Sequence, residues 1–301
     1  MNADRQKAPT PWPLIVLFSG ISLSVIIAGL LYYNYQKNAL LSEKQLELSA
    51  ISDLKIRQIT QWRSERIGNG EFLGENTFLV RRFSRFLQKS TNPSLRKNIL
   101  QSLKSLTENF DYRNVLLLDI NGNVSLAYPD QDTVTGNHLQ PLLAEIIKQR
   151  KVLLTDLHVV NLVDFVHLDL IIPLIDRSAN DTLVLGLLVV RVDPKKVLYP
   201  LIQSWPIPSK SAETLLFRRD GDEIVYLNEL RYIKNSELTL RKPVTTDKLP
   251  AAMALNGITG TLDGIDYRNV QVVAAMKKIP GTNWYMVSKI DRDEVFSVLK
   301  N

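Results

Sequence analysis

The sequence contains no cysteine and only three histidines among its 301 residues. Without cysteine there is no disulfide, no catalytic thiolate and no thiolate zinc site, so an exported domain must be held together by its apolar core. Three histidines leave little material for acid–base catalysis near neutral pH. The G-x-S-x-G, H-E-x-x-H and G-x-x-x-x-G-K-[ST] patterns are also absent. We therefore expect no catalytic residue and no cofactor in this chain.

The sequence has no block of one charge. It has 37 Lys and Arg against 31 Asp and Glu, a formal net charge of +6, and the two signs are mixed along the chain. A nucleic-acid groove would show clustered Lys and Arg with interleaved aromatic residues. We expect no nucleic-acid partner, and the mild basicity suits a protein near anionic lipid headgroups.

Only one long apolar run is present, LIVLFSGISLSVIIAGLLYY at residues 14–33, with no charge in 20 positions. A helix of that length spans the roughly 30 Å hydrocarbon core of a bilayer. Trp12 and Tyr35 flank it as interfacial aromatic residues do. A signal peptide would be shorter and end in a small-x-small cleavage site, and a buried soluble helix would not be apolar on every face. We predict a transmembrane helix over 14–35.

The orientation follows from topology, because the charges on the two sides of the run are nearly balanced. Arg5 and Lys7 precede it, and Lys37 and Lys44 follow it. A short N-terminus usually stays in the cytoplasm. We therefore expect a cytoplasmic N-terminus over 1–13 and a single-pass protein of the cell inner membrane with its bulk in the periplasm.

The region 36–110 is expected to be helical. Gln36 to Arg66 contains no Pro or Gly and has apolar residues at steps of three and four, which predicts one long stalk helix stopped by Gly68-Asn69-Gly70. A second helix is expected over Phe72–Leu87, and a third from a cap at Ser94 to Phe110.

After Asp111 the sequence changes to strand patterns. The expected elements are strands at Val115–Asp119, Val152–His158, Phe165–Pro173 and Leu183–Val192, a hairpin at Asn121-Gly122 and a helix at Pro141–Arg150.

Much of this pattern is repeated. The first similar pair of segments is NVLLLDINGNVSLAY and ETLLFRRDGDEIVYL, in which Gly122 and Gly221 lie 99 residues apart. Two further similar pairs are VVRVDP with VSKIDR and LDLIIPLI with VVAAMKKI. Similar spacing at three landmarks predicts two modules, 111–194 and 195–301, each a five-stranded antiparallel sheet with helices against it.

At this level the chain resembles the double Cache sensor domain of bacterial and archaeal membrane receptors over Gln36–Asn301. The resemblance is carried by DYRNVLLLDINGNV, HLDLIIPL, LYPLIQSWPIPSKSAETLLFRRDGDEIVYLNELR and PGTNWYMVSKIDRDEV, which look most like the extracytoplasmic sensors of PAS-containing histidine kinases. It implies an α+β fold with an N-terminal transmembrane helix, a long stalk helix and two tandem PAS-like modules, the first membrane-distal and the second membrane-proximal.

The resemblance also implies a function. The distal module of the family usually holds a small ligand, and the proximal module passes the change to a second transmembrane helix and a two-component output. The Arg-x-Trp-Tyr signature of the amino-acid-binding members has no counterpart here, so the resemblance does not extend to an amino-acid ligand. Val295–Asn301 looks like the start of a helix that stops before a second crossing. We therefore expect either that the chain is a fragment of a receptor or that the signalling part is a separate protein.

Four polar residues suggest a ligand site in the distal module. Asp156 and His158 lie two apart on one expected strand, and His167 and Asp169 lie two apart on the next. Alternation places each pair on one strand face, so pairing around Val159–Val166 would bring all four together. Such a group could bind a small carboxylate or ammonium ligand, or a divalent metal. The favoured alternative is a polar sheet face with two cross-strand Asp–His pairs.

Further candidates lie nearby. Tyr112 and Arg113 enter the first strand and could offer a stacking face and a donor to an anionic ligand, or simply form a solvated junction. Arg81, Arg82 and Arg85 more plausibly form a solvated helix face.

These observations favour an extracytoplasmic sensor that binds a small solute, with carboxylates among the candidates, and dimerises through the Gln36–Arg66 helix. Two alternatives stay open. One is a membrane-tethered assembly module without a small ligand. The other is a tethered hydrolase or metalloenzyme built on the His/Asp group.

Overall fold

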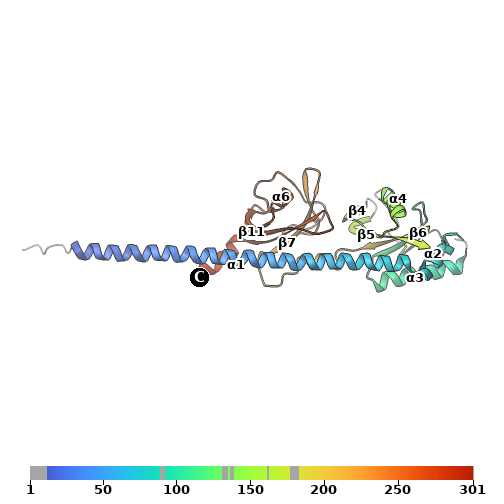
Figure 1. Ribbon diagram of the computed structural model, residues 1–301, viewed down its shortest axis with the longest axis horizontal. Coiled ribbons are helices and arrows are strands. Elements are labelled where there is room, and N and C mark those ends of the chain that lie inside the picture. Colours follow the sequence, from blue (N-terminus) through green and yellow to red (C-terminus); the bar gives the residue numbers. More distant parts are fainter. Residues whose placement is uncertain are drawn as a thin grey trace, which may run out of the picture.

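One helix, α1 (Trp12–Glu75), runs along almost the whole molecule, and two antiparallel sheets lie along the same side of it (Figure 1). The computed structural model describes residues 12–88, 92–130, 135, 139–160, 163–176 and 183–300. The predicted cytoplasmic N-terminus lies outside them except for its last two residues. With 64 residues, α1 is about 96 Å long.

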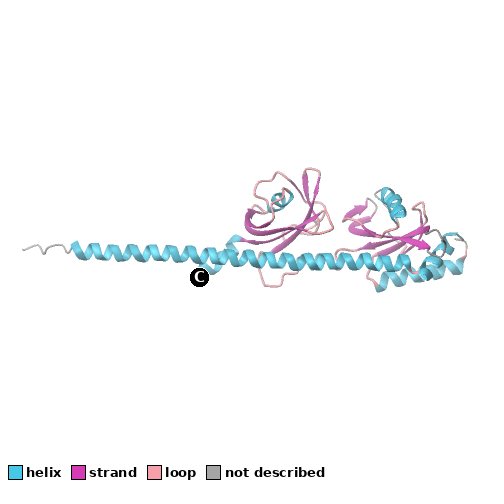
Figure 2. Ribbon diagram, in the orientation of Figure 1, coloured by secondary structure: helices cyan, strands magenta, loops and turns pink. Residues whose placement is uncertain are grey.

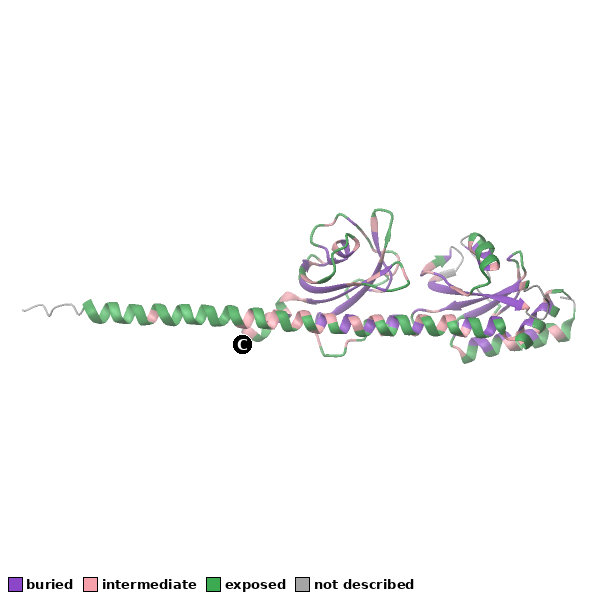
Figure 3. Ribbon diagram, viewed as in Figure 1, coloured by how far each residue is buried: buried purple, intermediate pink, exposed green. Residues whose placement is uncertain are grey.

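The two parts of α1 have different surroundings (Figure 3). The apolar window of the predicted transmembrane stretch has no buried residue, and within the described residues α1 is the one helix long and apolar enough to cross a membrane. From Leu48 onward one face of the helix is buried, including Ile51, Ile59, Trp62 and Leu73. The exposed apolar part is what a bilayer would cover, and the buried face is where the sheets pack.

The prediction that Gly68-Asn69-Gly70 ends the stalk helix is wrong, because α1 continues to Glu75. A Cβ on Gly70 would lie 2.8 Å from Cγ1 of Val152, and one on Gly74 would lie 2.7 Å from the carbonyl oxygen of Pro173. These two glycines let the helix approach the first sheet closely. The packing gained there outweighs the roughly 1 kcal/mol helix propensity that each glycine loses.

Two shorter helices cap the far end of α1. They are α2 (Thr77–Gln88) and α3 (Pro93–Asn109), so Phe72 to Glu75 belong to α1 and not to the second helix as predicted. Asn76 caps α2, since its Oδ1 accepts from the backbone N–H of Phe78 and Leu79. The cap of α3 is Asn92 and not Ser94, because Pro93 fits the first helical turn and its missing N–H costs nothing there.

The first sheet, here called the distal sheet, is built from residues 114–192. Its strands are β1 (Asn114–Leu118), β2 (Val124–Tyr128), β3 (Leu153–Leu154), β4 (His158–Val160), β5 (Val163–Asp176) and β6 (Leu183–Val192), in the order β2-β1-β6-β5-β3 with β4 also paired to β5. The helix α4 (Leu139–Gln149) matches the predicted one closely. Leu117, Leu170 and Val190 pack toward α1 and α3, whereas Leu116, Ile171 and Val189 pack with α4.

The second sheet, here called the proximal sheet, follows the short helix α5 (Leu198–Gln203). Its strands are β7 (Glu213–Asp220), β8 (Glu223–Tyr226), β9 (Arg241–Pro243), β10 (Gly260–Ile265), β11 (Gln271–Lys278) and β12 (Trp284–Asp291), in the order β10-β11-β12-β7-β8-β9. The helix α6 (Pro250–Leu255) covers the face turned away from α1, as Figure 2 shows. The chain ends with α7 (Arg292–Val295) and a 3-10 helix, η1 (Phe296–Lys300), beside α1.

The two sheets share one topology, as the sequence repeat predicts. The central order β2-β1-β6-β5 of the distal sheet corresponds to β8-β7-β12-β11 of the proximal sheet. Gly122 and Gly221 both turn a hairpin with positive φ, 86° and 60°. Each sheet has six strands and not the expected five. The extra pairings come from β4 and from β9, which are only three residues long and carry little pattern.

Lys55 joins α1 to the connection between the sheets. Its side chain is buried, and Nζ donates to the carbonyl oxygens of Leu201 (3.0 Å), Ile202 (2.6 Å) and Ser204 at the end of α5. The end of a helix leaves such carbonyls without intrahelical donors and attracts a cation. Burial lowers the pKa of Lys55 to about 8.

The glycine contacts can be tested by substitution. We expect Gly74→Ala to lower the free energy of unfolding by about 1–3 kcal/mol, because the new methyl group meets backbone that cannot move aside. Gly68→Ala is the matched control: it faces open space, so it should stabilise by up to about 1 kcal/mol. Thermal unfolding in detergent measures both, and a stabilising Gly74→Ala would contradict the close contact.

The Lys55 contact gives a pH-dependent prediction. Between pH 8 and 10.5 the unfolded chain holds a proton on Lys55 that the folded protein has released, so raising the pH through this window favours folding. Relative to Lys55→Met, the wild type should gain up to about 3 kcal/mol across the window. Chemical unfolding followed by circular dichroism at each pH measures the difference. A difference that stays constant over the window would show that Lys55 does not titrate as described.

Candidate functional site

A row of buried polar side chains crosses the distal sheet on the face covered by α4. In the strand register, Asn114 of β1 lies opposite Arg191 of β6, and Arg191 lies opposite Asp169 of β5. Arg191 and Asp169 are completely buried and Asn114 nearly so. Burying a guanidinium and a carboxylate costs free energy unless they form ion pairs or hydrogen bonds with each other or with a ligand. This row is therefore the first place to look for function.

Two histidines extend the row at the edge of the sheet. His158 of β4 lies opposite His167 of β5, with ring centroids 4.3 Å apart. Nε2 of His158 lies 3.4 Å from Oδ2 of Asp169, and Nε2 of His167 lies 3.9 Å from Oδ1. Nε of Arg191 approaches the same Oδ1 at 3.6 Å. The His167 side chain is fully buried and that of His158 is 19% exposed, so the group is accessible at His158.

Hydrogen bonds fix the tautomers of both rings. Nδ1 of His158 lies 2.9 Å from the carbonyl oxygen of Asp156, and Nδ1 of His167 lies 3.0 Å from that of Phe165. A carbonyl only accepts, so each Nδ1 carries the hydrogen and each neutral ring has its lone pair on Nε2. Burial lowers the pKa of His167 to about 4, so this ring is neutral near pH 7. Nε2 of His167 has no hydrogen-bond partner among the described residues.

The ligand atoms of His158, His167 and Asp169 all lie within 4.8 Å of one another. Two imidazole nitrogens and a carboxylate are a donor set for a divalent transition metal, and the same groups can bind a polar organic solute. Three of the four residues predicted to converge therefore do so.

Asp156 does not join them, so the predicted convergence is wrong for this residue. The expected strand Val152–His158 is interrupted between β3 and β4. Thr155 holds the interruption, because its N–H donates to the carbonyl of Asp169 and its Oγ1 accepts from the N–H of Asp169. Strand alternation does not continue through such a break, and the Asp156 side chain turns toward the proximal sheet.

Asp156 forms a junction between the two sheets. Its Oδ1 accepts from Nε1 of Trp284 at 2.6 Å, and its Oδ2 accepts from Nδ2 of Asn283 at 3.0 Å and pairs with Nη1 of Arg218 at 2.8 Å. Arg218 also donates to the carbonyl of Leu157. On α1, the guanidinium of Arg63 lies 5.0 Å from the ring centroid of Trp284. The junction therefore contacts the distal sheet, the proximal sheet and the stalk helix.

Tyr112 and Arg113 separate in the structure. Tyr112 is buried in the core toward α1, stacked on Phe110 at 5.7 Å, with Arg66 over its ring. Its predicted proximity to the distal ligand group is not found. The Arg113 guanidinium lies 3.6 Å from the ring centroid of Phe165, whose ring is 5.0 Å from that of His167. His158, His167 and Asp169 are here called the histidine group. Arg113 therefore lies at the rim of the histidine group.

Sequence reasoning missed Arg191, although two signals point to it. It is the one charged residue in the otherwise apolar run LVLGLLVVRV. The repeat VVRVDP/VSKIDR also aligns it with Lys289, so both modules place a cation at the same sheet position.

At the equivalent position of the proximal sheet, carboxylates of the same module neutralise the charge of Lys289. Lys289 pairs with Glu213 across β12 and β7, and its Nζ lies 3.0 Å from Glu213 and 2.7 Å from Asp266. Tyr267 donates to Glu213, and Arg268 pairs with Asp266. Lys289 is completely buried. One cation with two carboxylates and further donors forms a closed network.

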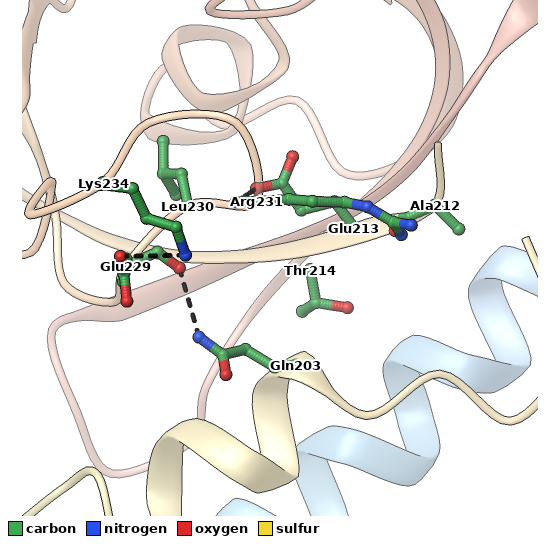
Figure 4. Close-up of a pocket in the computed structure, with 8 residues that line it drawn as sticks. All are labelled: Gln203, Ala212, Glu213, Thr214, Glu229, Leu230, Arg231 and Lys234. Atoms are coloured by element: carbon green, nitrogen blue, oxygen red, sulfur yellow. Dashed lines mark hydrogen bonds and ion pairs between the residues drawn. The ribbon is translucent and has the colours of Figure 1, made fainter. Parts of the chain in front are cut away.

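A pocket of about 300 Å³ lies beside this network, between α5 and the loop after β8 (Figure 4). Its charged groups already have partners. Lys234 pairs with Glu229 at 3.3 Å, and the Arg231 guanidinium donates to the carbonyls of Ala212 and Ser209. A second hollow, lined partly by Arg81, Arg82 and Arg85, lies on the surface between α2 and α3. Neither combines burial with converging donors as the histidine group does.

Comparisons with known proteins support the fold. No protein-family model and no curated protein matches the sequence. Among solved structures, the sensory domain of the Campylobacter jejuni chemoreceptor Tlp3 is similar over 87% of this chain and 98% of its own, with a TM-score of 0.54 and 16% identity. The ligand-binding domain of Mlp24 with asparagine covers 88% and 98%, with a TM-score of 0.53 and 13% identity.

A third similar structure is the ligand-binding domain of the Pseudomonas aeruginosa amino-acid chemoreceptor PctB in complex with L-Arg. It covers 85% of this chain and 98% of its own, with a TM-score of 0.53 and 15% identity. The shared features are a long N-terminal helix followed by two antiparallel sheets. The chain thus has the α+β double Cache fold.

Proposed function

We propose that this chain is the extracytoplasmic sensing region of a membrane-anchored signalling receptor, with residues 14–35 in the bilayer and both sheets outside the cytoplasm. The exposed apolar third of α1 supports the anchor, and the long buried face of the same helix supports the stalk. The similarity in fold to chemoreceptor sensory domains supports a sensing role. The output is a histidine kinase of a two-component system, and the receptor is a homodimer through the Gln36–Arg66 part of α1.

The distal sheet binds the solute at the histidine group. The observation that carries this proposal is the contrast between the two equivalent sheet positions. In the proximal sheet the buried cation has two carboxylates from its own module. In the distal sheet the buried cation, Arg191, approaches Asp169, whose carboxylate also lies near the Nε2 atoms of His158 and His167, and His158 is partly exposed at the sheet edge. A buried polar group whose donors and acceptors converge near an opening is what a small-solute site requires.

The junction at Asp156 provides a route from the site to the proximal sheet. His158, a member of the site, is hydrogen-bonded through Nδ1 to the backbone of Asp156, and the Asp156 carboxylate holds Trp284 and Arg218. A solute that moves His158 therefore moves a segment that is bonded to β7 and β12. The displacement of the proximal sheet relative to α1 biases a two-state output.

A solute screen tests the function. The full chain in detergent, stripped of metal with a chelator and tested with and without added Zn²⁺, should be stabilised against heat by at least one solute among carboxylates, amines, amino acids and the ion itself, by about 1–3 kcal/mol at saturating solute. Amino acids enter the screen because the similar structures hold them, although the Arg-x-Trp-Tyr signature is absent. His158→Gln, at the partly exposed edge, should remove the effect while the variant still unfolds cooperatively.

The control is Glu145→Gln on the exposed side of α4, which should keep the stabilisation. If neither metal-free nor Zn²⁺-supplemented protein responds to any solute class or to the ion, the sensing proposal fails and the tethered assembly module takes its place.

The junction can be measured by a double-mutant cycle. We expect Asp156→Ala and Arg218→Met to show an interaction energy of about 1–2 kcal/mol in thermal unfolding, since the pair is partly buried and supported by Trp284. The matched control is the ion pair between Lys277 and Asp53, which joins β11 to α1 on the more exposed surface. Its interaction energy should stay below about 1 kcal/mol. Equal values for the two cycles would contradict a special role for the junction.

A further inference from the structure

We propose that His158, His167 and Asp169 form a site for one divalent transition-metal ion of the Zn²⁺ type, and that this ion is the solute of the distal sheet. Making the ion the sensed ligand rests on the function proposed above, whereas the site itself rests on the geometry of the three side chains. The sequence pattern leaves two kinds of ligand open for this group, a small carboxylate or ammonium solute and a divalent metal. The positions of the ring nitrogens favour the metal.

The first argument is the direction of the lone pairs. Both rings have their Nδ1–H bonded to a backbone carbonyl, and both Nε2 atoms lie near the Asp169 carboxylate. Metal-binding histidines show the same arrangement, in which the far nitrogen donates to a carbonyl and the near one faces the ion. Nε2 of His167, fully buried and without a hydrogen-bond partner among the described residues, faces the group from within the sheet.

The separations between the three ligand atoms suit one metal ion. Two ligand atoms at about 2.0–2.1 Å from a tetrahedral Zn²⁺ lie roughly 3.3 Å from each other. The separations from the Asp169 oxygens to Nε2 of His158 and His167 are 3.4 and 3.9 Å, and all three ligand atoms fall within 4.8 Å. Small side-chain rotations are enough to close the three around one ion.

The types of ligand atom decide which ion the site suits. Imidazole nitrogen suits Zn²⁺, Ni²⁺ and Cu²⁺, whereas Mg²⁺ and Ca²⁺ require oxygen ligands. Three protein ligands leave at least one position open, toward the exposed edge at His158. Arg191 contacts Oδ1 of Asp169 and fixes the carboxylate, while Oδ2 faces His158. The site is therefore arranged to exchange an ion with solvent.

The test is zinc binding by the full chain in detergent after removal of metals with a chelator. We expect one Zn²⁺ per chain by elemental analysis and no uptake of Mg²⁺ or Ca²⁺. Competition with a chromophoric chelator should give at least about 100-fold weaker Zn²⁺ binding for His158→Gln, His167→Gln and Asp169→Asn. Glu145→Gln should bind as the wild type does. Bound Co²⁺ should show the intense visible absorption of a four-coordinate site, changed in each histidine variant.

Folding of each variant is checked by its circular dichroism and its unfolding temperature without metal. His158→Gln keeps the test decisive if the buried variants unfold, because His158 lies at the exposed edge. No Zn²⁺ uptake by the wild type, or equal affinity in His158→Gln, overturns the ion site. Stabilisation of metal-free protein by an organic solute, with no Zn²⁺ uptake, overturns the ion site but leaves the proposed sensing function standing.

Discussion

Burial of one face of α1 is the interaction on which the rest of the structure depends. Each sheet has two apolar faces, and the short helices α4 and α6 cover only the one turned outward. The inner faces are covered by the same long helix, from Leu48 beside the proximal sheet to Leu73 beside the distal one. With no cysteine to crosslink the chain, this shared apolar contact and the Lys55 anchor hold the two sheets in a fixed order along one rod.

That arrangement explains why the polar groups lie where they do. The face toward α1 supplies the apolar contact that holds each sheet on the helix, and the buried charged rows lie on the outward faces, under α4 in one sheet and under α6 in the other. The charged row of the proximal sheet satisfies itself with Lys289, Glu213 and Asp266, which adds rigidity. The row of the distal sheet ends in two imidazoles, and Nε2 of the neutral His167 ring has no hydrogen-bond partner among the described residues. The contact with α1 and the buried polar groups therefore lie on opposite faces of each sheet, and the polar groups differ between the two modules.

The sequence was informative wherever the physical cause is local. The membrane helix follows from an uncharged run, and the repeated topology follows from hairpin glycines and matching strands. Gly70 was misread as part of a helix stop, because its role depends on close contacts with Leu170 and Ile172, about a hundred residues away in sequence. The pairing of His158 with His167 followed from alternation, but Asp156 did not, since the break at Thr155 is set by a contact with Asp169. Arg191 was visible as a lone charge in an apolar strand and was passed over.

The matched positions of Arg191 and Lys289 also have a historical consequence. If the two modules descend from one ancestral unit, a cation at this strand position predates the duplication, and the surroundings diverged afterwards. One copy acquired Glu213 and Asp266, so the charge of its buried cation is neutralised within the module. The other carries two histidines on the edge strands beside its cation, and on the function proposed above these form the site that responds to a solute. A duplicated fold can in this way keep one buried charge in two copies and surround it differently in each, once with carboxylates and once with imidazoles.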